Sequence, residues 1–272
     1  MMGDVSAYNK IVKFIKQKNS KSAIDIINKM PGLCERIRNS TGSNLLHIAC
    51  LYNCNSVAKT LFNKKSANEY DNESYTPLYY CTFNNNEDLC QFFVDNGVAP
   101  DHQSFFNAVR TCGLVLIKIL FTVKQKFNIL DVRKQNLLIH ALKQKRSYCI
   151  VDYISHQCEI NQVDVFNSTP MHYAARCLRA GYEKVLYLLS KQGANIAHRD
   201  NLDRNPLDYI KKFELKIEVS NLSRKHGRFH RRRWFLMFLA QFKFLSGQHE
   251  TDKIYICVFG VPELYKKIMT YI

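Results

Sequence analysis

The apolar residues of this chain recur at intervals of three and four, which predicts a series of short amphipathic helices. Three such stripes consist of Tyr8, Ile11, Val12 and Ile15; of Ala23, Ile24, Ile26 and Ile27; and of Val185, Leu186, Leu188 and Leu189. In the first stripe Lys10, Lys13 and Lys16 turn outward. Polar segments separate the stripes, and we interpret the lysines as a solvated helix face.

The clearest unit lies within residues 166–200, where the sequence TPMHYAA begins at Thr169. Thr169 can cap a helix, and Pro170 fits its first turn because no N–H is needed there. The second helix, with its stripe from Val185 to Leu189, follows a break at Gly181, and Gly193 supplies a stop. The pattern predicts a helix, a tight return, an antiparallel helix and a turn.

The same pattern recurs along the chain. Its equivalent positions are Asn44, Thr76, Gln103, Asn136, Thr169 and Asn205, at gaps of 32, 27, 33, 33 and 36 residues. The short gap fits a trimmed turn around residues 98–100, and the long one fits three extra residues, 178–180. The segments TPMHYA and TPLYYC resemble the T-P-L-H-x-A signature of the ankyrin repeat, whose period is 33 residues.

This resemblance implies an all-α, ankyrin-repeat solenoid of stacked helix-turn-helix units with a C-terminal helical tail. One unit cannot bury its apolar faces alone, so several must stack. We expect an irregular N-terminal helical cap at 1–38, repeats at 39–213, a basic linker at 214–233 and a capping or docking module at 234–272. By the same resemblance, His47 and His172 should hydrogen-bond backbone between neighbouring units.

The cysteines and the apolar segments indicate in which cellular compartment the protein is expected. Of ten cysteines, five fall at repeat positions where we expect small buried hydrophobes: Cys50, Cys81, Cys90, Cys112 and Cys149. No secretory signal is recognisable in residues 1–21, and the apolar run 234–245 is too short to span a bilayer. These features favour the reducing cytosol or nucleus and no membrane association.

No motif indicates catalysis. The sequence contains no glycine-rich phosphate loop, no HExxH and no GxSxG, so we expect neither an enzyme nor a metal or cofactor site. The formal net charge of +16 divides into +5 for residues 1–40, +4 for 41–220 and +7 for 221–272. Because the excess lies at the two ends, nucleic-acid binding is unfavoured. The basic run 223–233 could be a solvated linker, a contact for an acidic partner or RNA, or a nuclear-import signal.

The resemblance places protein recognition on the concave side, around turn tips and the ends of first helices. The residues expected there are Tyr52, Tyr75, Phe83, Arg110, Arg133, Lys143, Phe166 and Arg176. The first three are aromatic and most of the others are basic, and aromatic and arginine side chains commonly anchor interfaces. The alternative for each ring is simple packing between repeats.

The tail leaves two hypotheses open. Leu236, Ala240 and Phe244 share one helix face, a pattern similar to the elongin-binding helix of a suppressor-of-cytokine-signalling box, although Ala240 replaces its usual cysteine. Pro262 and Leu264 lie in a segment similar to the opening of an F-box, which would bind a Skp1-type adaptor. In the alternative, both helices cover the open end of the last repeat.

Overall fold

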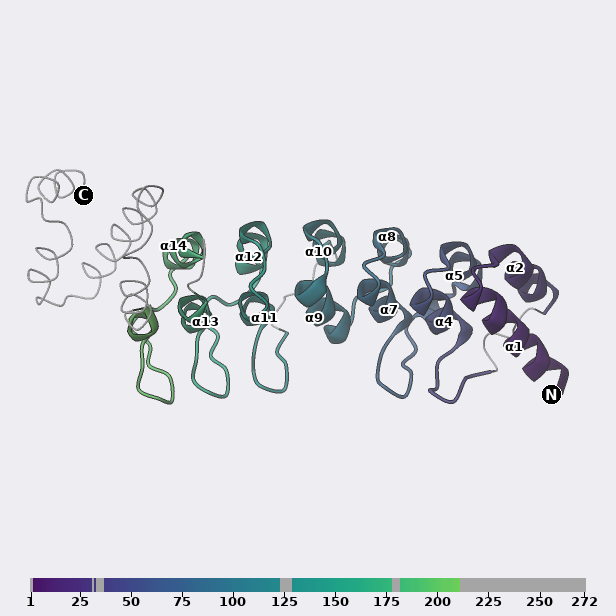
Figure 1. Ribbon diagram of the computed structural model, residues 1–272, viewed down its shortest axis with the longest axis horizontal. Coiled ribbons are helices and arrows are strands. Elements are labelled where there is room, and N and C mark those ends of the chain that lie inside the picture. Colours follow the sequence, from purple (N-terminus) through teal and green to yellow (C-terminus); the bar gives the residue numbers. More distant parts are fainter. Residues whose placement is uncertain (1, 31, 33–36, 123–128, 178–181, 211–272) are drawn as a thin grey trace, which may run out of the picture. The chain divides into compact units, whose positions relative to one another are not determined.

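The computed structural model describes residues 2–30, 32, 37–122, 129–177 and 182–210 (Figure 1). Within these residues the regular structure is helical. The helices are α1 (Met2–Lys16), α2 (Ser20–Lys29), α4 (Leu45–Leu51), α5 (Asn55–Leu61), α6 (Lys64–Ala67), α7 (Pro77–Phe83), α8 (Glu87–Asp95), α9 (His102–Thr111), α10 (Leu114–Phe121), α11 (Leu137–Lys143), α12 (Tyr148–Ser155), α13 (Pro170–Arg176) and α14 (Glu183–Lys191). The chain forms two compact units, Met1–Val165 and Phe166–Ile272.

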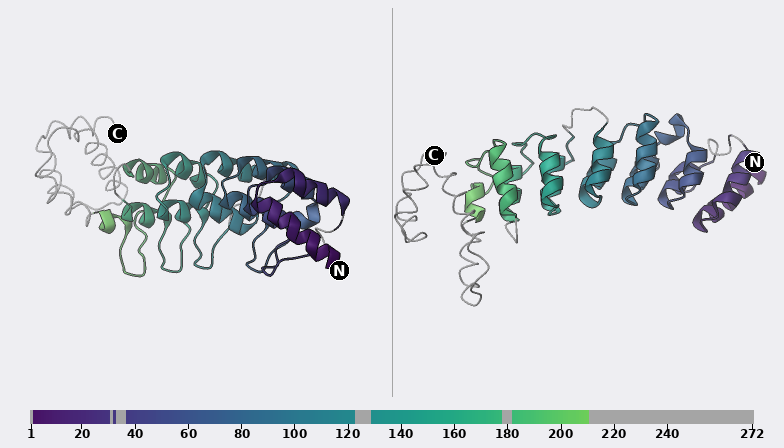
Figure 2. Two further views of the ribbon diagram at one scale, coloured as in Figure 1. Left: turned by 45° about the vertical axis from the view of Figure 1, so that its right-hand side comes forward. Right: turned by 90° about the horizontal axis from the view of Figure 1, so that it is seen from above.

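The first unit is built from consecutive antiparallel helix pairs. The first helices of the pairs, α4, α7, α9 and α11, pack against one another in chain order, while α5 contacts α8, and α8 contacts α10 (Figure 1). The N-terminal pair α1 and α2 covers α4 and α5. Seen from above, these pairs stand side by side (Figure 2). The predicted N-terminal stripes are confirmed, because Ile11, Ile15 and Ala23 are fully buried.

The first helices begin at side chains that accept a hydrogen bond from the backbone three residues later, as N-caps do. Asn44, Thr76, Asp101 and Asn136 all cap in this way. Sequence spacing placed the third equivalent position at Gln103, whereas α9 begins two residues earlier, after the cap Asp101. The helical periodicity of α9 does not identify its first residue, whereas the Asp101 carboxylate, which accepts from the Ser104 N–H at 2.6 Å, does.

Six-residue turns precede most first helices, and we call each a finger. The fingers are 39–44, 71–76, 131–136, 164–169 and 200–205, each ending at an N-cap position. The first residue of a finger is Asn or Asp, and its fourth residue has positive φ: Gly42, Ser74, Lys134, Asn167 and Asp203. At Asp71, for example, Oδ1 accepts from the N–H groups of Glu73 and Tyr75, each at 3.0 Å. This local hydrogen bonding makes the turn independent of a glycine.

The connection between α8 and α9 contains no finger. Gly97, with a φ of 76°, ends α8, and the chain reaches the cap Asp101 through only Val98, Ala99 and Pro100. The trimmed turn expected at residues 98–100 is therefore confirmed. In Figure 1 a finger hangs below α7 and another below α11, but none hangs below α9.

The second unit contains α13, α14 and a short helical stretch at residues 206–210. Pro170 lies in the first turn of α13, and Val185, Leu186 and Leu189 of α14 are buried, as the pattern predicted. Gly193 has a φ of 84°, which confirms it as the stop after α14. The extra residues 178–180 and everything after residue 210 lie outside the described residues.

The cysteine prediction was right at four of five positions. Cys50, Cys81, Cys90 and Cys112 are buried, whereas Cys149 is exposed. Cys149 is the second residue of α12, and the buried face of that helix is formed by Ile150, Val151 and Ile154. The described cysteines are free thiols, and burial raises the pKa of Cys112 to about 11, so this thiol stays protonated.

Candidate recognition surface

Three rings form a continuous strip along the first unit. Tyr75, at the end of its finger, stacks on Tyr79 of α7 with ring centroids 3.9 Å apart and an interplanar angle of 6°. Phe83, one turn further along α7, continues the strip at 6.5 Å from Tyr79. We call Tyr75, Tyr79 and Phe83 the aromatic strip. Phe83 is 59% exposed, so the strip ends in an accessible ring.

Tyr80 packs edge-on against the aromatic strip. Its ring meets those of Tyr75 and Tyr79 edge-on, at 6.1 and 5.6 Å, and its hydroxyl donates to Asp71 Oδ2 at 2.6 Å. Burial, followed by the neighbouring Tyr75 hydroxyl, raises the pKa of Tyr79 to about 12. Tyr79 is therefore neutral at physiological pH, and the strip is fixed by its own contacts, which reduces the entropy lost on binding.

Cationic side chains follow the strip. Arg110 at the end of α9, Arg133 on the finger 131–136 and Lys143 at the end of α11 are exposed. Lys143 is held by a hydrogen bond from Nζ to Gln135 Oε1 at 2.9 Å. Arg146 donates to the carbonyls of Arg110 and Cys112 and so fixes the end of α9. We call Arg110, Arg133 and Lys143 the basic strip.

Of the eight predicted recognition residues, Tyr75 and Phe83 lie in the aromatic strip, and Arg110 is near enough to Tyr79 to affect its pKa. Arg133 and Lys143 are exposed on the repeat that follows α9 and α10. Tyr52 is half-buried beneath Lys16, whose ammonium lies 5.8 Å from the ring centroid. Sequence reasoning missed Tyr79, which stands in TPLYYC where the repeat signature has a histidine. That replacement puts a ring where Tyr75 can stack, and it was the available signal.

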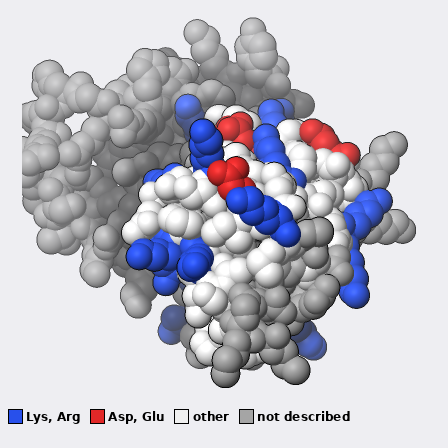
Figure 3. All heavy atoms as spheres, turned by 90° about the vertical axis from the view of Figure 1, so that its right-hand side faces the viewer, with Lys and Arg blue, Asp and Glu red and all other residues white. Residues whose placement is uncertain are grey.

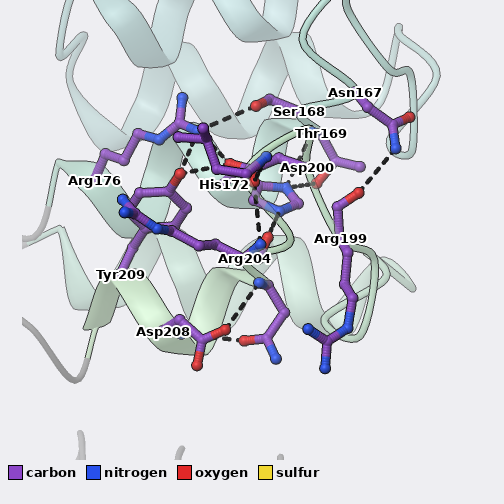
Figure 4. A network of polar contacts seen from close by, with 12 residues as sticks. Asn167, Ser168, Thr169, His172, Arg176, Arg199, Asp200, Arg204, Asp208 and Tyr209 are labelled. Atoms are coloured by element: carbon purple, nitrogen blue, oxygen red, sulfur yellow. Dashed lines mark hydrogen bonds and ion pairs between the residues drawn. The ribbon is translucent and has the colours of Figure 1, made fainter.

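In the second unit, Phe166 is 52% exposed, but Arg176 is engaged in internal contacts. Its Nη2 donates to Ser168 Oγ, Asp200 Oδ2 and Tyr209 Oη at 3.1, 2.9 and 2.9 Å (Figure 4). Its guanidinium also lies 4.4 Å from the centroid of the Tyr209 ring. Asp200 is buried, so this ion pair contributes to the stability of the finger 200–205.

The two signature histidines, His47 and His172, each link one repeat to the finger of the next, as the resemblance implied. His47 Nε2 lies 3.1 Å from the Tyr75 carbonyl of the next finger, and His172 Nε2 lies 3.1 Å from the Arg204 carbonyl. In each ring Nδ1 accepts from the backbone N–H of the N-cap residue, so the neutral ring donates through Nε2. Burial is the main cause that lowers the pKa of both histidines, which favours this neutral form.

The end formed by α1 and α2 also carries cations. Its exposed lysines are Lys10, Lys13, Lys16, Lys18, Lys21 and Lys29. Figure 3 shows the lysine and arginine side chains standing apart on this face, with acidic side chains between some of them. Such spacing gives no single concentrated anion site.

Within the described ranges, no three His, Cys, Asp or Glu side chains converge in a way that could hold a metal ion. Among the helices described there, none combines the length and apolar character needed to cross a bilayer.

Comparison with known proteins identifies the repeats. The ankyrin repeat domain of human ASB11 is 18% identical in sequence, has a TM-score of 0.60, and matches over 76% of this chain and 96% of that domain. The ankyrin repeat domain of Bcl-3, described as a unique member of the IkappaB protein family, is also 18% identical, with a TM-score of 0.58 over 75% of this chain and 97% of that domain. Comparison with curated proteins gave no significant match. The family profile for ankyrin repeats (3 copies) matches residues 5–104 and 105–200, and the chain belongs to the ankyrin-repeat family.

Proposed function

We propose that this chain is a recognition scaffold that binds a partner protein across the aromatic and basic strips of its first unit. Ankyrin repeats imply a protein–protein interaction scaffold, and such domains are generally non-enzymatic. The observation that carries the finer proposal is the exposed end of the aromatic strip at Phe83, together with the exposed Arg110, which is near enough to Tyr79 to affect its pKa. A rigid aromatic anchor next to exposed cations is typical of the residues that dominate interface energetics.

The test compares two equally exposed apolar side chains. Phe83 is 59% exposed on α7, and Val115 is 57% exposed on α10, in the second row of helices. Phe83→Ser combined with Arg110→Glu should reduce capture of partner proteins at least tenfold, because both strips lose an anchor. Val115→Ser should leave capture unchanged, and all variants should keep the helical circular-dichroism signal. Equal capture by the Phe83→Ser, Arg110→Glu variant and the wild type would refute the proposal.

An adaptor role in a cullin-type ubiquitin ligase is a second proposal, and it rests on the tail sequence. The docking residues Leu236, Ala240, Phe244, Pro262 and Leu264 lie outside the described residues. Leu236→Glu combined with Leu264→Glu should abolish co-purification with elongin or Skp1-type adaptors if the tail docks such a protein. Unchanged co-purification, or none with the wild type, would count against it.

A further inference from the structure

Successive fingers are joined by one recurrent backbone hydrogen bond. The N–H of a finger's second residue donates to the carbonyl of the third residue in the preceding finger. This bond joins Asn72 to Thr41 at 2.9 Å, Val165 to Arg133 at 3.0 Å and Asn201 to Phe166 at 3.0 Å. The fingers therefore form a ladder in which each has a donor on one side and an acceptor on the other.

The missing finger before α9 interrupts this ladder. By position, the carbonyl of Glu73 should accept from that finger, and the N–H of Val132 should donate to it. Neither group makes a hydrogen bond within the described part of the chain, and Val132 is 99% exposed. An acceptor and a donor are thus left open on the two fingers that flank the gap. Open backbone edges of this kind are templates for pairing with another chain.

The side chains around the gap indicate the chemistry of an occupant. The finger 131–136 carries two exposed cations, Arg133 and Lys134, which form no ion pair with the described residues. On the other flank lies the stack of Tyr75 on Tyr79. Arg110 is near enough to Tyr79 of α7 and His140 of α11 to affect the pKa of both, so a further cation lies between these two helices. An acidic partner segment complements these charges.

We infer that the gap between fingers 71–76 and 131–136 binds a tight acidic turn of a partner protein, which occupies the position of the missing finger. The second residue of this turn donates its N–H to the Glu73 carbonyl, and the carbonyl of its third residue accepts from the Val132 N–H. Its carboxylates lie near Arg133 and Lys134. This inference rests on the proposed recognition function and adds the conformation and charge of the segment that is recognised.

A turn fits this position better than a helix does. The backbone groups of a helix interior are bonded within the helix, so it cannot supply both a free N–H and a free carbonyl to opposite flanks. In the chain's own fingers, adjacent residues supply these two groups. In the finger 71–76, the N–H of Asn72 donates to the preceding finger, and Glu73 holds the position whose carbonyl accepts from the next one.

The probe for the test is a fluorescein-labelled peptide, cyclised through added terminal cysteines, with the sequence of residues 69–76, EYDNESYT. It combines a finger-forming sequence with three carboxylates. We expect saturable binding to the full chain by fluorescence anisotropy, weakened at high salt because charge pairs are screened. Hydrogen exchange at Val132 should slow in the complex. Absence of binding at millimolar peptide would overturn the inference.

Two matched variants separate backbone pairing from side-chain contact. Val132→Pro removes the open N–H, and proline is favoured at the second position of such turns, so the finger should remain folded. It should weaken peptide binding at least tenfold, whereas Val132→Ala should change it less than twofold. Equal affinity in Val132→Pro and wild type would overturn the inference. If Phe83→Ser with Arg110→Glu still reduced partner capture, the proposed function would survive that failure.

A loop replacement tests occupancy directly. Substituting residues 97–101 with the sequence of residues 193–205 supplies an internal finger at the gap. This variant should lose binding of the cyclic peptide and melt at a higher temperature than the wild type, because the ladder is complete. Undiminished peptide binding in a folded variant would show that the peptide binds elsewhere and would overturn the inference.

Discussion

The bond between Asp71 and Tyr80 connects the stability of a finger to the position of the aromatic strip. Asp71 is buried, and its carboxylate accepts three hydrogen bonds, two from the backbone of its own finger and one from the Tyr80 hydroxyl. Tyr80 in turn holds the rings of Tyr75 and Tyr79 edge-on. Removing the carboxylate should therefore loosen both the finger and the strip.

The magnitude follows from the three bonds. A hydrogen bond to a charged group contributes about 1.5–3 kcal/mol, so Tyr80→Phe, which keeps the ring, should cost about that much. Asp71→Ala also removes the acceptor of two backbone N–H groups near solvent, at about 1 kcal/mol each, and should cost about 3–5 kcal/mol. Each single variant loses the bond between Asp71 and Tyr80, and the double variant, Asp71→Ala with Tyr80→Phe, loses that same bond only once. The coupling energy should accordingly be about 1.5–3 kcal/mol.

Urea unfolding of the full chain, followed by circular dichroism, measures this cycle through the midpoint and slope of each transition. Asp95→Ala is the control, because Asp95 is exposed at the end of α8 and should change the free energy of unfolding by less than about 0.5 kcal/mol. If the losses from Asp71→Ala and Tyr80→Phe add within about 0.5 kcal/mol, the two side chains are not coupled and the reasoning fails.

Three further predictions concern stability. Lys145 follows α11 with a φ of 52°, so Lys145→Gly should stabilise the chain by about 1 kcal/mol while Lys145→Ala should not, as thermal melts can show. The pKa of His47 and of His172 is lowered in the folded chain, so the unfolded chain binds more protons in acid. The melting temperature should therefore be constant above pH 7 and fall as the pH drops below 6.5, the ordinary pKa of histidine. His47→Gln should make the melting temperature depend less on pH in this range. Ala174 is fully buried in α13, and Ala174→Leu should cost about 1–3 kcal/mol by overpacking; an unchanged melt would contradict this.

The repeats were predictable because their signals are local. A capping side chain, a proline in the first turn and apolar residues at helical spacing identify α7 and α13 without any tertiary information. The start of α9 was not predictable in the same way. Both Asp101 and Gln103 lie close before the same apolar face, and periodicity alone does not say which residue caps the helix.

The exposure of the proposed recognition residues could be predicted in part from the sequence, but their contacts could not. Positions relative to the signature located Tyr75, Phe83 and Arg110 near turn tips and helix ends. They did not reveal that Arg176 is committed to Asp200, because that bond depends on a finger 24 residues later. Long-range polar contacts of this kind are set by three-dimensional packing, and a sequence pattern does not report them.

The interval of only 27 residues between Thr76 and Gln103, which leaves no room for a finger before α9, changes the surface of the chain more than its core. Removing a finger leaves the helices α7 and α9 packed, so the apolar core loses little. What changes is the surface, where the Glu73 carbonyl and the Val132 N–H lose their partners beside the Tyr75–Tyr79 stack and ahead of the basic strip. Departures from a repeat pattern that spare the core but expose bonding groups are where function is expected. The irregular third repeat is therefore the part of the described chain at which partner specificity should be sought.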